Sequence, residues 1–506
     1  MKLWPGWRII LEQLGVAYEV IRRWDGVTPE RFSAIIVNDI PDSTEMEVLD
    51  AYMREGGGVL DAAAWLPAVE PAMIGNRGIG AMVPAADDDL FRHIWLADLD
   101  TRVKLHREAT WMGGAVYLGD RGGGAIACLA FDPGTLLRDV RSVRRQFHAP
   151  ASPYPNEIVA RVSKGEIRRI VEAALRWLHA RRGLPYVHRW HFPGRLPCIF
   201  CCRIDSDYGT REQVESLHAV ARDHDIAMTW FLHAEAHAGW LERFAAMDDQ
   251  EMALHGYRHR TFRGYEENRA NIAAAAALLE REGIPFTGFA APNGFWNVSL
   301  ARAVADAGLV YTSEFSLDYD DLPFHPELYG DSSPVLQVPI HPICIGSLAR
   351  VKAGAAVMKE YFRGVIDRGF RLREPVILYH HPGHEYWDVI ADSFRCVRGF
   401  GIVNMTMGEY AAWWLRRERV RFEAWYDGDA IGARFRTAEP DVELAVRDAA
   451  GRYGFIAGDG AHRYADIAWD AAPEPVAAPA DIRKIRRWSP LLLRHSIEDC
   501  TSRARQ

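Results

Sequence analysis

Two carboxylates follow an apolar run in the middle of the chain. The run from Cys198 to Ile204 is apolar apart from Arg203, and Asp205 and Asp207 come directly after it. Side chains alternate along a strand, so Arg203, Asp205 and Asp207 are predicted to share one face. Two acids on one face are costly unless a cation or a proton balances them. The pattern predicts a cation site at the end of a strand, with a solvated turn as the alternative.

Two histidines with helical spacing stand further along the chain. His255 and His259 flank the sequence Gly-Tyr-Arg, and residues i and i+4 stack when a segment winds as a helical turn. A carboxylate and two imidazoles make a three-ligand site with open positions, which is typical of a catalytic metal. These ligands suit Zn²⁺, and also Co²⁺, Ni²⁺ or Mn²⁺.

A third polar group follows the apolar run at residues 376–379. This run leads into His380 and His381, and His384 comes after Pro382 and a glycine. Polar residues thus recur at the carboxyl ends of predicted strands, where α/β folds place their sites. His380 and His384 also have i, i+4 spacing, but Pro382 argues against a regular helix between them.

Two other patterns could also bind metal. His233 and His237 are four apart and follow a strand-like run, and we favour a structural role for them. Cys198 and Cys201 form a Cys-x-x-Cys on the buried strand, but no second such motif accompanies them. The sequence therefore predicts core packing for both cysteines rather than zinc or redox use.

Taken together, these motifs resemble those of the polysaccharide deacetylases. Residues 195–415 are similar to this family, the NodB-homology group related to carbohydrate esterase family 4, whose fold is a distorted (β/α) barrel. The segments that carry the resemblance are Asp205-Ser206-Asp207, Met228–Leu232 with its Thr-x-Phe pattern, His255–His259, Phe289–Gly294 and Tyr379–Pro382.

The resemblance implies a role for each motif residue. Asp205 would be the general base, and His381 the general acid, with His380 as the less favoured candidate. The Asn293 backbone N–H would stabilise the oxyanion. The implied metal ligands are Asp207, His255 and His259. The implied reaction is metal-dependent removal of N-acetyl groups from an amino-sugar glycan or a glycan precursor, which would be the substrate partner.

This sequence departs from the family pattern at several positions. Ala290 stands where the third motif usually has an arginine that orients the catalytic acid. Arg203 shares a predicted strand face with that acid and is expected to take over the role. Asn293 replaces the usual tyrosine, which leaves the backbone donor intact. Glu314 and Asp318 are both candidates for the acid of the fourth motif.

Four residues beside the motifs are predicted to contact the substrate. They are Arg203, Tyr208, Pro292 and Trp296. An aromatic ring such as that of Trp296 could stack on a sugar, although aromatic residues beside a cleft are as often part of the core.

The rest of the chain predicts an α/β protein of three domains. Residues 1–185 alternate helix-like and strand-like patterns, which predicts a doubly wound layer resembling flavodoxin and glutamine-amidotransferase domains, without a catalytic site. Residues 186–417 would form the (β/α) barrel. Residues 418–506 would form a small β-rich domain with a basic tail that includes Arg483–Trp488.

Composition excludes several function classes. The 506 residues carry 60 Lys and Arg against 68 Asp and Glu, a net charge of −8. This charge gives no general attraction to nucleic acid or an anionic membrane, and no run is long and apolar enough to span a bilayer. The first residues lack a signal-peptide pattern, and seven irregularly spaced cysteines predict reduced thiols. We expect a cytoplasmic protein and leave homo-oligomer formation open.

Three functions fit the sequence. The favoured one is a metal-dependent deacetylase acting on N-acetylated sugars. The second is hydrolysis of a cyclic imide or ureide, as in allantoinase-like relatives of the same fold. The third is a non-catalytic glycan-binding protein that keeps its metal site, to which Ala290 lends weight.

Overall fold

The computed structural model describes residues 5–85, 88–485 and 488–505. The chain forms two compact units, which we call the flanking unit and the barrel unit. The flanking unit contains Met1–Asp139, Val162–Arg195 and Arg416–Ala478. The barrel unit contains Val140–Arg161, Leu196–Leu415 and Pro479–Gln506. The division at residues 185 and 417 remains a prediction, and by their contacts residues 140–161 and 479–506 group with the barrel.

An eight-stranded sheet is the centre of the barrel unit. Its order is β17-β14-β13-β12-β11-β10-β18, and β19 also pairs with β10. All of these pairings are parallel, which confirms the predicted α/β class. The strands are β10 (Ile199–Asp205), β11 (Met228–Leu232), β12 (Glu251–Leu254), β13 (Gly288–Phe289), β14 (Tyr311–Thr312), β17 (Leu336–Gln337), β18 (Val376–His380) and β19 (Val403–Asn404).

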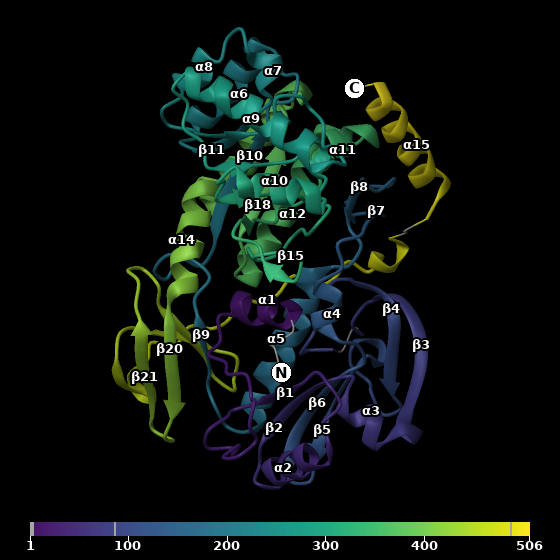
Figure 1. The fold of residues 1–506 in the computed structure, drawn as a ribbon, viewed down its shortest axis with the longest axis vertical. Helices are drawn as coiled ribbons and strands as arrows, with labels where there is room; N and C mark the ends of the chain where they lie inside the picture. The colour runs from purple at the N-terminus through teal and green to yellow at the C-terminus, as the bar shows by residue number, and fades with distance from the viewer. Residues whose placement is uncertain (1–4, 86–87, 486–487, 506) are drawn as a thin grey trace. The chain divides into compact units, whose positions relative to one another are not determined.

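Helices surround these strands (Figure 1). Each long helix turns an apolar stripe inward; in α9, for example, Ile272, Ala275 and Leu279 are buried. The helices are α6 (Arg211–Asp223), α7 (Ala234–His237), α8 (Glu242–Ala245), α9 (Tyr265–Arg281), α10 (Val298–Asp306), α11 (Ile345–Arg350), α12 (Ala355–Leu372), α13 (Trp387–Gly399) and α14 (Met407–Arg419). A short hairpin, β15 (Glu327–Leu328) with β16 (Asp331–Ser332), precedes β17.

A hairpin and the C-terminal helix complete the barrel unit. Strands β7 (Ser142–Gln146) and β8 (Asn156–Ala160) pair in antiparallel fashion, and helix α15 (Pro490–Arg505) lies beside them in Figure 1. Arg144 donates from Nε to Ser496 Oγ at 3.0 Å, and Asn156 contacts the His495 ring at 3.0 Å. Sequence far from the motifs is therefore packed into the barrel unit.

The flanking unit contains a four-stranded sheet. Strands β1 (Ile35–Val37), β2 (Gly58–Ala62) and β6 (Gly124–Leu129) are parallel, and β5 (Val116–Arg121) is an antiparallel edge. The glycine turn before β2 has a packing reason, because a Cβ on Gly57 would lie 2.2 Å from the Tyr52 ring. The resemblance to flavodoxin-like domains stays a prediction. The helices of this part are α1 (Pro5–Leu14), α2 (Ser43–Arg54), α3 (Trp65–Val69), α4 (Pro133–Leu137) and α5 (Lys164–Arg181).

The remaining strands of the flanking unit are antiparallel. A long ribbon of β3 (Ile74–Met82) and β4 (Ala97–His106) was not expected from the sequence. The segment after α14 forms two small sheets, as its alternating pattern predicts. These are β20-β21-β24 and β23-β22-β9, and β9 comes from before the barrel. Their bounds are β9 (Tyr186–Arg189), β20 (Arg421–Tyr426), β21 (Ala430–Thr437), β22 (Leu444–Arg447), β23 (Tyr453–Ile456) and β24 (Gly460–Arg463).

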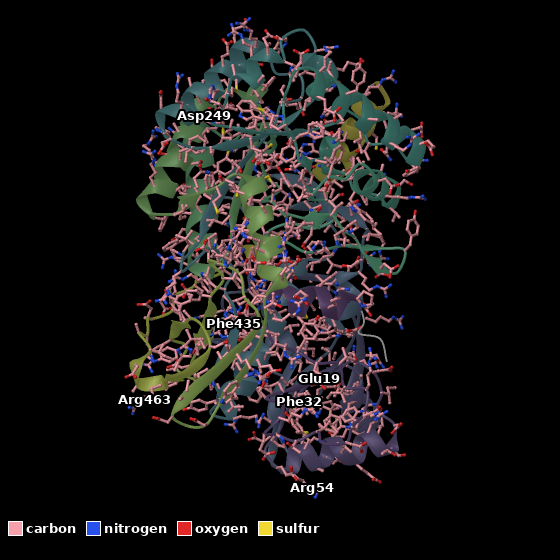
Figure 2. The ribbon with its side chains drawn as sticks, turned by 60° about the vertical axis from the view of Figure 1, so that its left-hand side comes forward. Glu19, Phe32, Arg54, Asp249, Phe435 and Arg463 are labelled. Carbon is pink, nitrogen blue, oxygen red and sulfur yellow. The ribbon has the colours of Figure 1, made fainter. Side chains whose placement is uncertain are left out.

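Charged side chains lie mainly at the surface. Figure 2 labels Arg54, Asp249 and Arg463 at the periphery, and each is exposed. Within the described part of the chain, no helix has the length and apolar character needed to cross a membrane. Of the predicted basic tail, residues 486 and 487 lie outside the described residues. The cytoplasmic location stays a prediction.

One buried cation ties together several segments of the flanking unit. Arg417 is fully buried, and its guanidinium donates to four backbone oxygens at 2.6–3.1 Å. These oxygens belong to Trp190, Glu12, Gln13 and Arg189. The helix α1, the strand β9 and the end of α14 thus share one hydrogen-bonding centre.

Substitution of this arginine should destabilise the protein. We expect Arg417→Met to lower the free energy of unfolding by about 3 kcal/mol, because each buried oxygen left without a donor costs about 1–3 kcal/mol. Denaturant unfolding measures the change. Arg419→Met is the control, since the Arg419 side chain is 64% exposed, and it should stay within about 0.5 kcal/mol of the parent. Equal stability of both variants would contradict this account.

Candidate metal and catalytic site

One cavity of the barrel unit collects the predicted chemistry. It has a volume of about 220 Å³ and lies at the carboxyl ends of β10, β12, β13 and β18. Because these strands run parallel, side chains that follow them meet at one edge of the sheet. Six of the predicted residues line it, namely Asp205, Asp207, His255, His259, Asn293 and His381.

Asp207 and two histidines form a cluster of metal-ligand type. Asp207 Oδ1 lies 3.2 Å from His255 Nε2 and 3.0 Å from His259 Nε2. Donors around one tetrahedral zinc at about 2.0–2.1 Å stand roughly 3.3–3.5 Å apart, so these separations are close to those of a ligand set. This is one of two groups in the described residues whose donor atoms lie close enough together to hold a metal ion.

The hydrogen bonding of His255 supports this interpretation. Its Nδ1 lies 2.7 Å from the carbonyl oxygen of Ala290, which can only accept, so Nδ1 carries the proton. In the neutral ring Nε2 then offers a lone pair to the cluster. His255 Nε2 and Asp207 Oδ1 are buried, and neither makes a hydrogen bond with the described residues. Two facing acceptors are explained by a cation between them, so these residues fit a divalent metal.

The backbone reaches this arrangement by turns rather than by a helix. The expected helical turn at 255–259 is wrong: the segment is irregular, and Gly256 has φ +88°. Strand β10 ends at Asp205, and Asp207 follows with φ 42°. A non-glycine residue with left-handed backbone costs about 1–3 kcal/mol, a strain found mostly at functional sites. The carboxylate is thereby aimed at the histidines instead of continuing the strand.

Arg203 holds Asp205 in a fixed orientation. Its Nε donates to Asp205 Oδ1 at 2.6 Å and its Nη2 to Oδ2 at 2.7 Å, while Nη1 donates to the Ser313 carbonyl. Burial alone would raise the pKa of Asp205, but the charge of Arg203 holds it below its usual range. Asp205 is therefore an ionised carboxylate with one fixed geometry.

The position of Arg203 bears on two predictions. The guanidinium stands beside Asp205, where the sequence predicts that it compensates for Ala290. It is also fully buried and does not line the cavity, so from this position it supports Asp205 and does not reach a substrate.

Glu314, one of the two fourth-motif candidates, accepts hydrogen bonds from the Ala291 N–H at 2.9 Å and the Thr312 hydroxyl at 2.6 Å. Burial controls the protonation of Glu314. It raises the pKa of this carboxyl to about 7, although the Thr312 hydrogen bond and the charge of Arg203 both lower it. The charge of Arg203 thus acts on two acids, Asp205 at the cavity and the buried Glu314. We infer that Glu314 helps to position the Arg203 side chain and the turn that carries Ala291.

The histidines after β18 differ in environment. His381 lines the cavity, with Nε2 3.6 Å from Asp207 Oδ2. His380 is 1% exposed, and its ring packs edge-on against Phe362. The geometry therefore favours His381 over His380 as the residue that can meet a reacting group.

His233 and His237 support the acidic turn. A ring nitrogen of His233 lies 3.0 Å from the Asp207 backbone oxygen, and one of His237 lies 2.9 Å from the Ser206 hydroxyl. Burial lowers the pKa of His233 to about 4 and that of His237 to about 3, so both rings are neutral. They fix the turn from outside the metal-type cluster, in agreement with the structural role preferred from the sequence.

The third motif gives one wall of the cavity. Asn293 has φ 59° within the short turn Pro292–Gly294 and lines the cavity, whereas Pro292 and Trp296 do not. Tyr208 is 61% exposed, and its ring lies 5.7 Å from that of His259. Tyr208 therefore stands outside the cavity lining, next to a predicted ligand, where a bound substrate could reach it.

Several lining residues carry no motif and were missed. Asn156 and Glu157 come from the β7–β8 hairpin. Cys344 precedes α11, Ser347 and Arg350 belong to α11, His384 follows β18, and Asp499 belongs to α15. Only His384 stood beside a recognised motif; nothing in the sequence connects residues 140–161 or 479–506 with the barrel.

Arg350 connects α11 with the C-terminal helix. It donates to Glu498 at 2.8 Å and to the His495 carbonyl at 3.1 Å, and it pairs with Asp499 at 2.9 Å. Arg350→Met should therefore loosen α15. We expect limited proteolysis to remove the C-terminal helix several-fold faster, since the lost contacts are worth about 1–2 kcal/mol. Arg371→Met on α12 is the control, and equal cleavage rates in the two variants would refute the role of Arg350.

Comparisons with known proteins find similarity to solved polysaccharide deacetylases. A Mycobacterium smegmatis protein described as a polysaccharide deacetylase is 17% identical, with 44% of this chain and 91% of that chain covered and a TM-score of 0.38. A probable polysaccharide deacetylase from Pseudomonas aeruginosa PAO1 is also 17% identical; the match covers 45% of this chain and 93% of that chain, with a TM-score of 0.39. A family 4 carbohydrate esterase from Streptomyces lividans, in complex with acetate, is 16% identical; the match covers 41% of this chain and 91% of that chain, with a TM-score of 0.31.

Sequence comparisons give no further relatives. No family model matches the chain, and no curated protein matches it. The chain is thus similar in structure to polysaccharide deacetylases over less than half of its length, and at this level of identity its function has to be argued from its own residues.

Proposed function

We propose that this protein is a metal-dependent hydrolase that removes N-acetyl groups from an amino-sugar-containing glycan or glycan precursor. The observation that carries the proposal is that two aspartates in one cavity have different kinds of partner. Asp205 is held by Arg203, whereas Asp207 faces His255 and His259. One carboxylate is thus fixed as a free base, and the other belongs to a ligand set.

The metal and the base would act together. A divalent ion held by Asp207, His255 and His259 would supply a Lewis acid that polarises an amide carbonyl and acidifies water. Asp205 lines the same cavity and is ionised, so it can accept a proton from the attacking water. Because Arg203 occupies both of its oxygens from one side, the carboxylate keeps a single orientation towards the cavity.

The opposite wall supplies the other groups that amide cleavage needs. The Asn293 backbone N–H would donate to the developing oxyanion. His381 would protonate the departing amine nitrogen. Burial lowers the pKa of His381, but the charges of the nearby carboxylates Asp207 and Asp205 raise it, so the ring can hold a proton at neutral pH. The arrangement combines an ionised base with a protonated acid, as hydrolysis of an unactivated amide requires.

The size of the cavity points to a small substrate group. About 220 Å³ is below the roughly 300–1,000 Å³ of usual ligand pockets. Asn156, Glu157 and Asp499 add polar groups to the wall, which suits the hydroxyl groups of a sugar. We propose that a single acetylated residue, at a chain end or in a short precursor, enters the site.

A substrate panel tests the proposal. The purified full-length chain, loaded with zinc, is given N-acetylglucosamine, its short oligomers, and a cyclic ureide and a cyclic imide. Acetate release from the sugars, abolished by a chelator, is the expected result. Hydrolysis of the ureide or imide without acetate release would replace the proposal with the ring-opening reaction. Binding of the sugars without turnover of any substrate would indicate a non-catalytic protein.

A further inference from the structure

A second cluster of metal-type side chains lies in the same cavity and has no part in the proposed reaction, except for one shared residue. Cys344, His381 and His384 each offer a donor atom, and these atoms all lie within 4.8 Å of one another. All three residues line the cavity. Cys344 precedes α11, and the two histidines follow β18, so the cluster joins two separate parts of the barrel unit.

The surroundings of these side chains leave donor atoms and room for a metal ion. The Nδ1 atoms of His381 and His384 are buried and make no hydrogen bond with the described residues. The His384 ring lies directly over Gly346, where a Cβ would stand 2.3 Å from His384 Cε1. The absent side chain leaves the room in which the imidazole lies beside Cys344.

The Cys344 thiol supplies the sulfur donor of the cluster. It is buried, and its Sγ lies 3.6 Å from the Ser347 hydroxyl at the start of α11. A thiolate is the form of cysteine that binds metal. A site made of thiolate and imidazole donors binds Zn²⁺ in preference to Mg²⁺ or Ca²⁺.

We propose that Cys344, His381 and His384 form a second metal site, specific for thiophilic divalent ions such as Zn²⁺. Tetrahedral zinc holds nitrogen and sulfur donors roughly 3.3–3.6 Å apart, so binding draws the three side chains inward by about 1 Å. Small rotations of the side chains provide this movement. The fourth position is open to water from the cavity.

Occupation of this site has a consequence that rests on the proposed function. His381 Nε2 lies 3.6 Å from Asp207 Oδ2, so this nitrogen faces the Asp207 cluster. The other ring nitrogen, Nδ1, is the atom that can bind a metal together with Cys344 and His384. A metal that binds this ring displaces its proton to solvent, so the ring can no longer give a proton to the leaving amine. The second site is therefore inhibitory, and the protein responds to zinc in two opposite steps.

Cobalt absorption tests the site without any substrate. The full-length protein is freed of metal and titrated with Co²⁺ in the absence of oxygen and thiol reductants. The Asp207 cluster contains no sulfur, so thiolate-to-cobalt absorption in the near ultraviolet reports the second site alone. We expect this band in the parent and in Cys500→Ser, an exposed cysteine, and its loss in Cys344→Ser. No band in the parent, or an undiminished band in Cys344→Ser, would overturn the proposal.

A zinc titration of acetate release tests the inhibition. Each protein is compared with itself at one equivalent of zinc. Excess zinc should lower the rate of the parent about 100-fold, the usual contribution of a general acid, and should leave Cys344→Ser and His384→Gln close to their starting rates. Equal inhibition of parent and variants would refute the inhibitory role. If no substrate is turned over, the proposed function fails, while the cobalt band still decides whether the site exists.

Discussion

Asp207→Asn should abolish metal binding and hydrolysis together. The change keeps the size of the side chain and removes its charge, which leaves His255 and His259 without an anionic partner. Loss of residues that merely orient ligands already costs about 10–100-fold in metal affinity or activity, so loss of a ligand should cost at least about 100-fold in both. Zinc content after gel filtration and the rate of acetate release measure the two effects.

A matched control exists in the same unit. Asp225 has φ 51°, close to the φ of 42° at Asp207, and its side chain is 97% exposed. Asp225→Asn therefore reproduces the chemical change in a similar backbone, and it should keep both zinc and activity. If Asp207→Asn retained zinc with parent affinity, the ligand assignment would be wrong.

Arg203→Met should lower kcat/KM about 100-fold and change its dependence on pH. The variant loses both hydrogen bonds that orient Asp205, and a misplaced catalytic group costs about that factor. Arg203 also lowers the pKa of Asp205 against burial. The base must be ionised, so activity falls as the pH drops through this pKa. Without the arginine the pKa rises, and the acid limb of the kcat/KM profile moves to higher pH.

Arg203→Lys separates orientation from charge. Lysine keeps the positive charge but cannot make the two-pronged contact with the carboxylate. We expect the acid limb of Arg203→Lys to stay near that of the parent while kcat/KM remains low. Zinc content and thermal unfolding show whether each variant is folded. An Arg203→Met enzyme that is folded and turns over at the parent rate would remove Arg203 from the mechanism.

The sequence predicts the parts of the site that repeat a local pattern. An apolar run followed by acids identified β10 and the residues Asp205 and Asp207, and the run before His380 identified β18. Parallel pairing then brings these ends together, which needs no knowledge of side-chain detail. The spacing of His255 and His259 predicted a shared metal, which stays a prediction. The structure brings both rings to Asp207 by a turn at Gly256 rather than by a helix.

Other parts depend on contacts that no local pattern records. The β7–β8 hairpin precedes α5 in the sequence, yet it packs in the barrel unit through Arg144, Asn156 and the C-terminal helix. Cys344 joins the cavity because the segment after β17 lies beside β18, where the His341 N–H donates to the Ile377 oxygen at 2.8 Å. Such long-range packing is decided by the folded backbone rather than by periodicity.

Chelation and reconstitution test the central claim most directly. The full-length protein is stripped of metal, and acetate release from N-acetylglucosamine oligomers is measured as zinc is added back. We predict no acetate from the metal-free protein and a rate that rises to its maximum at one zinc per chain. Acetate release that survives complete removal of metal, or a protein that binds one zinc per chain and releases none, would contradict the assignment of a metal-dependent deacetylase.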